Sequence, residues 1–146
     1  MNIILATTDK LEDAAQLAFK WIDEAEFAVE DKELREEIGR IFLNGIIVLA
    51  YDGDKAVGVL AGYKMEHFWT KDKTACEHWI YILPEYRKQG ITYQMCQTFF
   101  GWAKFQGCSA LVLTPNLFGS DNPDDIRDRL KKYDFKVYGY VMRRDM

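Results

Sequence analysis

The sequence predicts an α/β fold in which helices flank one mixed β-sheet, and three observations support it. Short β-rich runs alternate with helical segments along the chain, a hairpin signal joins two runs near the middle, and no linker, repeat or low-complexity stretch interrupts the order. At 146 residues, with 49% hydrophobic and 29% charged residues, the chain is long enough for one sizeable core. We therefore expect a single domain over residues 1–146.

The first half is expected to contain a strand, two helices and a β-hairpin. Apolar residues recur at helical spacing in two segments, of which the first opens with capping residues and the second stops at Asn44-Gly45. Asp52-Gly53-Asp54 lies between two β-rich runs and is a strong hairpin signal. The expected elements are a strand at 2–7, helices at 7–26 and 31–45, and two strands within 46–65.

The second half continues with strands and helices in alternation. Gly107 is expected to stop a helix, and Pro123 to begin the last one after a cap at Asp121 or Asn122. The expected elements are a central strand at 75–83, a helix at 91–106, a buried strand at 109–114, a helix at 120–133 and a terminal strand at 135–144. The full order is β-α-α-β-β-β-α-β-α-β.

Composition excludes several classes of protein. A formal net charge of −4 disfavours nucleic acid as the main partner. No apolar run approaches the roughly 20 residues of a membrane span, and the N-terminus lacks the features of a signal peptide. The three cysteines are widely spaced and odd in number, which suits neither a disulfide framework nor a zinc site. We expect a cytoplasmic protein that binds neither a membrane nor a metal.

Charge is distributed unevenly along the chain. Residues 9–37 contain eleven acidic and four basic residues, whereas residues 127–144 contain seven basic and two acidic ones. Two interpretations are open. These are either solvated faces of amphipathic helices, or the acidic segment attracts a cationic substrate.

The stretch PEYRKQGITYQM, residues 84–95, places cations and a glycine at the start of a predicted helix. Helix N-termini expose unpaired N–H groups, and Gly90 allows close approach of the backbone to an anion. Arg87 and Lys88 add positive charge beside those amides. The stretch therefore suits a phosphate or diphosphate, although a tight connection with surface cations is the alternative, and neither established glycine-rich phosphate motif is present.

The stretch IYILPEYRKQGIT resembles the acetyl-CoA-binding signature of the GCN5-related N-acetyltransferases, or GNAT superfamily, and the order of elements resembles theirs over nearly the whole chain. Arg87, Gly90 and Thr92 occupy the three fixed positions of its [RQ]-x-x-G-x-[GA] motif, with threonine in place of a small residue. The resemblance implies a mostly antiparallel central sheet with one splayed strand pair. It implies acetyl-CoA as cofactor, bound by Ile80, Tyr81, Ile82, Arg87, Lys88, Gln89, Gly90, Ile91, Thr92 and Asn116.

Transfer of an acetyl group to an amine requires a proton acceptor. Glu77 occupies a position that such enzymes often use, and burial would raise its pKa towards neutrality. The alternative is a solvated strand end with no role in catalysis. His78 is an apt base by its pKa but points to the other sheet face if the strand is regular, and it is otherwise a packed or surface residue.

The acid that protonates the thiolate is less well defined. Leu130 stands where relatives often carry a tyrosine, and Tyr133, three residues later, is the candidate to replace it. Packing of Tyr133 against the sheet, with water as the proton donor, is the alternative. Many relatives also end in two strands where one is predicted here, so a homodimer that supplies the missing edge is expected.

The resemblance leaves the acceptor unidentified beyond a small-molecule or peptide amine. Five aromatic residues fall near the segments that form the acceptor pocket in the family: Trp21, Phe27, Tyr63, Phe68 and Trp69. Most of them are expected in the core. Any that line the pocket would, together with the acidic helices, suit a cationic or apolar amine. Two other functions are weighed: an inactive acyl-CoA-binding module, and a nucleotide- or flavin-binding open sheet. The hairpin in the first half disfavours the latter.

Overall fold

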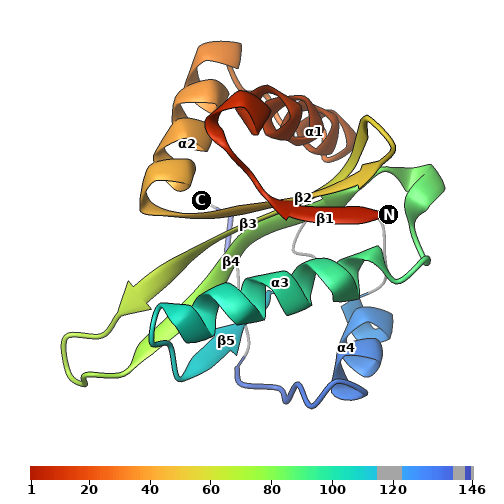
Figure 1. Ribbon diagram of the computed structural model, residues 1–146. Coiled ribbons are helices and arrows are strands. Elements are labelled where there is room, and N and C mark those ends of the chain that lie inside the picture. The colour runs from red at the N-terminus through yellow and green to blue at the C-terminus, as the bar shows by residue number, and fades with distance from the viewer. Residues whose placement is uncertain (115–122, 140–143, 146) are drawn as a thin grey trace. The chain divides into compact units, whose positions relative to one another are not determined.

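The computed structural model describes residues 1–114, 123–139 and 144–145. The chain folds as two compact units, Met1–Leu113 and Thr114–Met146. The larger unit is built on a five-stranded sheet whose strands lie side by side in chain order (Figure 1). The strands are β1 (Asn2–Leu5), β2 (Gly45–Asp52), β3 (Lys55–Glu66), β4 (Lys73–Ile82) and β5 (Ala110–Val112).

The sheet is mixed, as the sequence predicts. Strands β1 to β4 are antiparallel to their neighbours, and β5 alone runs parallel to the strand that it pairs with. The predicted hairpin joins β2 to β3, with Gly53 at a positive φ of 58°. A positive φ at the turn is the conformation that the Asp-Gly signal indicates.

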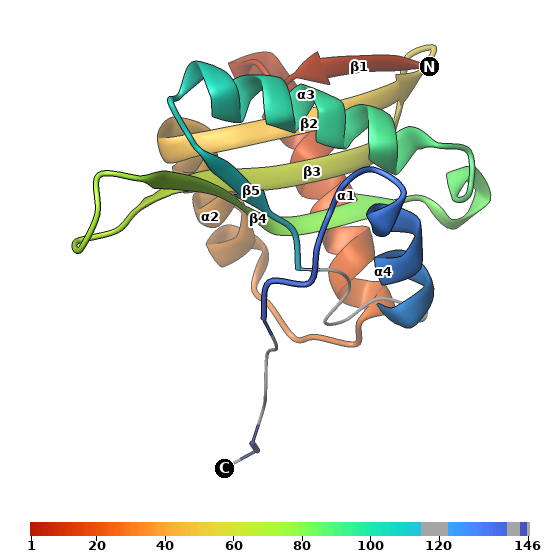
Figure 2. The ribbon, with the colours of Figure 1, turned by 90° about the horizontal axis from the view of Figure 1, so that it is seen from below.

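Helices cover both faces of the sheet (Figures 1 and 2). Helices α1 (Leu11–Glu24) and α2 (Asp31–Asn44) lie on one face, and α3 (Ile91–Phe105) lies on the other. Each helix turns one apolar stripe inward, as its helical spacing predicts. The buried stripes are Ala14, Ala15, Leu17, Ala18 and Ile22 of α1, Ile38 and Ile41 of α2, and Ile91, Met95, Cys96, Phe99 and Ala103 of α3.

Glycines on β3 let α3 approach the sheet closely. Phe99 is fully buried, and a Cβ at Gly62 would lie 2.6 Å from Cζ of its ring. Gly58 lies on the same face, where a Cβ would lie 3.3 Å from Sδ of Met95. The aromatic and thioether side chains of α3 therefore occupy the space that side chains on β3 would otherwise fill.

Short 3₁₀ turns lead into two of the helices. Residues Thr8–Lys10 form η1 before α1, and Pro84–Tyr86 form η2 between β4 and α3. The hydroxyl of Tyr86 donates to Asp52 at 3.0 Å, so η2 is held against the β2–β3 hairpin. The start of the first predicted helix is thus a separate 3₁₀ turn, while its main body is confirmed.

Two expectations for the C-terminal half are wrong. Strand β5 was expected to be buried, but Ala110 is exposed and Leu111 and Val112 are half-buried. A strand of three residues at the edge of the sheet, paired on one side only among the described strands, cannot be covered as a central strand is. Residues 135–139 of the predicted terminal strand are not in a strand, and residues 140–143 lie outside the described part of the chain.

The smaller unit contains α4 (Pro123–Lys131), which begins at the proline predicted for its first position. Its expected caps, Asp121 and Asn122, lie outside the described residues. Among the helices that are described, none has the length and apolar character needed to cross a membrane.

Gly62→Ala is expected to destabilise the larger unit by about 1–3 kcal/mol, because the new methyl group would displace the buried Phe99 ring or the backbone. Gly101→Ala is the matched control. Gly101 is exposed within α3 and a Cβ there meets nothing within 4 Å, so this change should stabilise the helix by about 0.5–1 kcal/mol. Urea unfolding measures both, and equal stability of Gly62→Ala and wild type would contradict the packing described here.

Candidate functional site

The backbone between β4 and α3 turns left-handed twice. Lys88 has a φ of 65°, which is uncommon for a residue with a side chain, and Gly90 has a φ of 77° as the N-cap of α3. A Cβ at Gly90 would meet nothing within 4 Å, so it would point into open space in front of the helix. Alternation of ordinary and left-handed residues curves the chain so that successive amides face one point, which is the geometry of an anion-binding nest.

Five consecutive amides of this loop are available to a ligand. The amide of Arg87 donates to Pro84 O at 3.2 Å, and that of Gln94 donates to Gly90 O at 3.2 Å. The amides of residues 88–92 donate to no protein oxygen within the described ranges of the chain. They lie at the positive end of the α3 dipole, and the first turn of α3 contains no acidic residue. The arrangement favours binding of an anion.

The side chain of Arg87 is turned towards helix α1 and the end of β4. Its Nη2 donates to both carboxylate oxygens of Glu24 at 2.8 Å, and its Nε donates to Ile82 O at 3.0 Å. The guanidinium also lies over the ring of Tyr81, 5.6 Å from its centroid. The cation predicted to face a phosphate is therefore paired within the protein, whereas Lys88 beside it is exposed.

Sequence reasoning missed Glu24. The only local signal was its position, because an acidic residue in the last turn of a helix is unfavourable unless a cation compensates it, and α1 has no base there.

Strand β4 leaves one edge open beside this loop. It pairs with β5 only from Thr74 to Cys76, opposite Ala110 to Val112. From His78 to Ile82 no described strand pairs with it on that side, while β3 pairs with every residue from Lys73 to Ile82 except His78. Ile80, Tyr81 and Ile82 lie on this open stretch, and Glu77 directly precedes it. A peptide-like ligand can add itself to such an edge by backbone hydrogen bonds.

A β-bulge at His78 decides which way the side chains of β4 point. The partner of Gly62 is Glu77 and the partner of Ala61 is Trp79, so His78 is an extra residue. Directly opposed residues share a face, and Gly62 faces α3, so Glu77 points towards α3 as well. The charge of Glu77 accordingly adds to the effect of burial in raising the pKa of Cys96 on α3 to about 12.

Beyond the bulge, the next side chains lie on the face covered by α1 and α2. Trp79 stacks on Trp21 of α1 with ring centroids 5.7 Å apart, and the ring of His78 lies 4.4 Å from that of Tyr63. Desolvation lowers the pKa of His78, and Glu37 of α2 opposes the shift. Glu77 and His78 thus lie on opposite faces as expected, although the regular strand assumed for that expectation is wrong.

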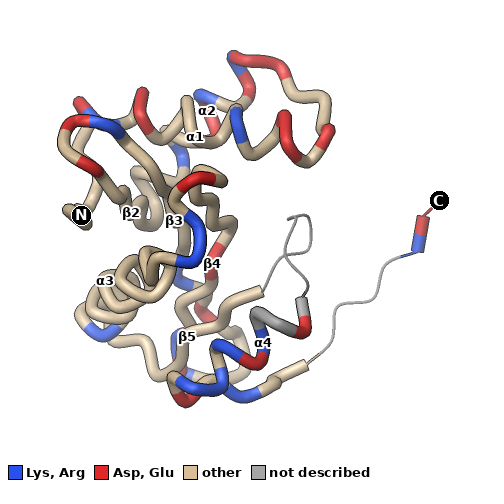
Figure 3. Tube along the Cα trace, turned by 90° about the vertical axis from the view of Figure 1, so that its right-hand side faces the viewer, with Lys and Arg blue, Asp and Glu red and all other residues tan. Residues whose placement is uncertain are grey.

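Aromatic and acidic side chains share the α1–α2 side of the molecule. Phe27 packs edge-on against Trp21 at 6.3 Å, beside the stack with Trp79. Acidic residues follow α1, α2 and the connection between them (Figure 3). Three of the five aromatic residues considered above are not in the core, since Phe27 is 41% exposed, and Phe68 is 95% and Trp69 is 69% exposed at the turn between β3 and β4.

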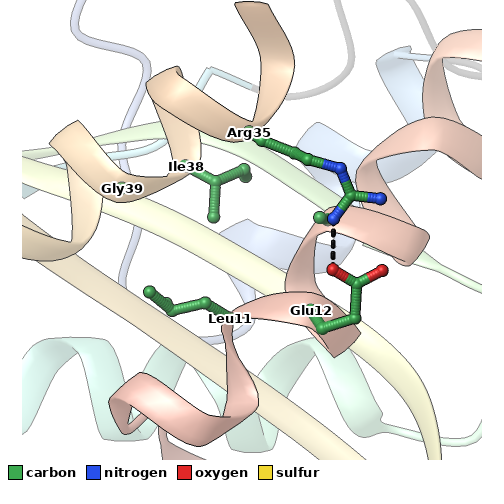
Figure 4. Close-up of a pocket in the computed structure, with 6 residues that line it drawn as sticks. Leu11, Glu12, Arg35, Ile38 and Gly39 are labelled. Atoms are coloured by element: carbon green, nitrogen blue, oxygen red, sulfur yellow. Dashed lines mark hydrogen bonds and ion pairs between the residues drawn. The ribbon is translucent and has the colours of Figure 1, made fainter. Parts of the chain in front are cut away.

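A small cleft of about 110 Å³ lies between the N-terminal part of α1 and α2 (Figure 4). Leu11, Ala15 and Ile38 form its apolar wall, and the ion pair of Glu12 with Arg35 crosses its mouth. Glu24 and the β4–α3 loop lie at the opposite end of α1. The cleft is therefore separate from the anion-binding loop.

Several predicted site residues are not brought together by the described structure. Asn116 lies outside the described residues. Tyr133 belongs to the smaller unit, where its amide donates to Leu130 O at 2.9 Å just after α4. No group of three or more histidine, cysteine, aspartate or glutamate residues suited to a metal ion occurs within the ranges that the structure describes.

Comparison with known proteins gives one family and many similar structures. The family model described as "Acetyltransferase (GNAT) family" matches residues 9–121. No curated protein matches the chain.

Similar solved structures cover nearly the whole chain. An apo aminoglycoside antibiotic 6'-N-acetyltransferase from Acinetobacter haemolyticus has a TM-score of 0.77 and 19% identity, with 100% of this chain and 98% of that chain covered. The enzyme AAC(6')-Iy in complex with a bisubstrate analogue of CoA and acetylneamine has a TM-score of 0.81 and 14% identity, covering 99% and 97%. A ribosomal-protein-alanine N-acetyltransferase from Brucella melitensis biovar Abortus has a TM-score of 0.72 and 18% identity, covering 98% and 99%. At these identities the likeness concerns the fold.

Proposed function

The chain belongs to the acetyltransferase (GNAT) family, and on that premise we propose that it transfers the acetyl group of acetyl-CoA to a primary amine. The observation that carries this proposal is the loop at the start of α3. Its five available amides at residues 88–92 lie next to the open edge of β4, so one ligand with a diphosphate and a peptide-like arm fits both. CoA has this combination of groups.

The coenzyme is assigned to residues on either side of η2. In the proposal, the amides of residues 88–92 and the ammonium group of Lys88 bind the diphosphate, and the backbone of Ile80, Tyr81 and Ile82 pairs with the pantetheine arm. The carbonyl of Ile82 already accepts a hydrogen bond from Arg87, so Ile80 and Tyr81 are the better placed of the three. Asn116, which lies outside the described residues, remains a proposed contact of the coenzyme.

In the reaction that we propose, the amine nitrogen attacks the thioester carbonyl directly. An N–C bond forms, the C–S bond breaks, the amine loses a proton and the CoA thiolate gains one. Glu77 is the proposed proton acceptor because it stands where β4 and β5 part. Its side chain points towards α3 and the proposed acceptor side lies on the other face of the sheet, so in the proposal the proton reaches Glu77 through water at the gap between the two strands. Tyr133 or water supplies the proton to the thiolate.

The proposed acceptor is a small cationic amine. Acidic residues along α1 and α2 lower the potential on the side where Trp21 and Trp79 stack, and aromatic faces attract cations. Several of the similar structures are enzymes named for aminoglycosides, which is consistent with an acceptor of this class. The homodimer and the cytoplasmic location expected from the sequence stay predictions.

CoA is expected to raise the melting temperature of the protein. At a hundredfold excess over its Kd, a ligand stabilises by about 2.7 kcal/mol, which corresponds to roughly 5–10 °C for a chain of this size. Gly90→Asp should abolish the shift, because it adds strain and a negative charge at the loop. Gly107→Asp is the matched control: it has a similar φ of 76° but lies beyond the other end of α3. A wild-type protein that CoA does not stabilise would contradict the proposal.

Release of free thiol from acetyl-CoA over a panel of amines tests the acceptor class. Polyamines and neamine are expected to react faster than neutral amines of similar size, and their advantage should shrink as ionic strength rises from 0.05 to 0.5 M. The panel also contains peptides with a free N-terminal amine and amino acids, both chosen to have a net negative charge. Faster reaction of the anionic acceptors would rule out attraction by α1 and α2, and no thiol release from any amine would favour a binding module without turnover.

Substitution of Glu77 distinguishes the two candidate bases on β4. Glu77→Gln should lower kcat by about 10²-fold or more with the Kd for CoA unchanged, and the acid limb of the pH–rate profile should disappear. His78→Gln is the control on the opposite face and should leave that limb in place. The reverse result, in which His78→Gln removes the limb, would assign the proton to the histidine, whose lowered pKa keeps it neutral at pH 7.

A further inference from the structure

Arg87 joins three parts of the chain that surround the anion-binding loop. Its Nη2 donates to both oxygens of Glu24, the last residue of α1, and its Nε donates to the carbonyl of Ile82, the last residue of β4. Glu24 and Arg87 are 63 residues apart in the sequence. The pair therefore connects the helix on the acceptor side of the sheet to the loop that is proposed to bind the coenzyme.

The ion pair of Arg87 with Glu24 is less exposed to solvent than the other described ion pairs of the larger unit. The side chains of Arg87 and Glu24 are 24% and 33% exposed, whereas each of those other pairs has a partner at least 57% exposed. Burial is the main cause that raises the pKa of Tyr81 to about 12, and the nearby carboxylate of Glu24 adds to the effect. A charge-assisted contact with low exposure holds its geometry better than a solvated pair.

The ion pair of Arg87 fixes the start of the anion-binding loop. Arg87 follows η2 directly and has extended backbone angles, and the next residue is the left-handed Lys88. A left-handed residue with a side chain persists only where its surroundings hold it. By fixing the start of the loop to α1 and β4, the guanidinium sets the direction in which the following amides point.

We propose that Glu24 and Arg87 are positioning residues for the coenzyme: they hold the loop so that the amides of residues 88–92 face the diphosphate. The inference rests on the proposed function, which places the diphosphate there. It assigns the side chain of Arg87, the first residue of the glycine motif, to the protein's own carboxylate and not to the phosphate groups.

Removal of the Glu24 carboxylate should change the affinity for CoA in opposite directions, depending on whether the carboxylate acts only by its charge or also positions the loop. A carboxylate near an anion site repels a polyanion such as CoA, so its removal should tighten binding if charge were its only influence. Loss of a positioning contact should weaken binding, because part of the binding free energy is then spent on ordering the loop. The sign of the change decides between the two.

Isothermal titration with CoA provides the test. Glu24→Gln is expected to raise the Kd about tenfold, and Arg87→Lys, which keeps the cation but loses the planar fork, should do the same. Asp23→Asn removes the same charge one residue away on α1 and should leave the Kd unchanged or slightly lower. The double variant Glu24→Gln/Arg87→Lys should bind no more weakly than the weaker single variant, since both changes break one contact.

Steady-state kinetics distinguish a loss of loop positioning, which affects the binding of acetyl-CoA, from a general loss of active enzyme. With the most reactive amine of the panel, Glu24→Gln should raise the KM for acetyl-CoA and leave kcat near wild type. If Glu24→Gln does not fold, as judged by circular dichroism without ligand, Arg87→Lys breaks the same contact from the other side and should show the same direction of change.

The outcomes distinguish the inference from the function on which it rests. If wild type binds CoA and Glu24→Gln binds as tightly as Asp23→Asn, or more tightly, the inference is wrong and the proposed function stands. If wild type binds no CoA at all, the proposed function is wrong.

Discussion

The orientation of the amides of residues 88–92 depends on a backbone that turns left-handed at Lys88 and again at Gly90. Amides that point at one place, together with the α3 dipole, form a positive site in a chain whose formal net charge is −4. Because the charge is partial and comes from the backbone, it needs no cluster of basic side chains. The surrounding contacts, from η2 against the hairpin to Arg87 against α1, keep this short segment in place.

A second constraint is the change of pairing along β4. The strand pairs with β3 on one side at every residue except His78, but within the described residues β5 pairs with it only from Thr74 to Cys76. One strand and its continuation therefore contain Glu77, the stretch after it that no described strand covers, and the loop before α3. The bulge at His78 then turns Trp79 towards α1, so that the same strand contributes aromatic surface to the opposite face.

Most of the fold could be predicted from the sequence because its signals are local. The period of apolar residues gave α1, α2 and α3, Asp52-Gly53-Asp54 gave the hairpin, and Pro123 gave the start of α4. The predicted burial of β5 was wrong because an apolar run does not reveal whether its strand is central or at an edge. Residues 135–139 contain Phe, Val and Tyr, which favour strands, but they are not in a strand, since a β-rich pattern needs a neighbour to pair with.

The sequence by itself determined that a glycine loop with an exposed cation precedes α3, because glycine at a positive φ and a helix N-terminus are properties of a few consecutive residues. It also determined the positions of Glu77 and His78 on one strand. Only the tertiary structure decided that Arg87 pairs with Glu24, that β4 bulges at His78, and that the described part of β5 pairs with β4 no further than Cys76. These features join segments far apart in the chain, and no local pattern encodes a contact across 63 residues.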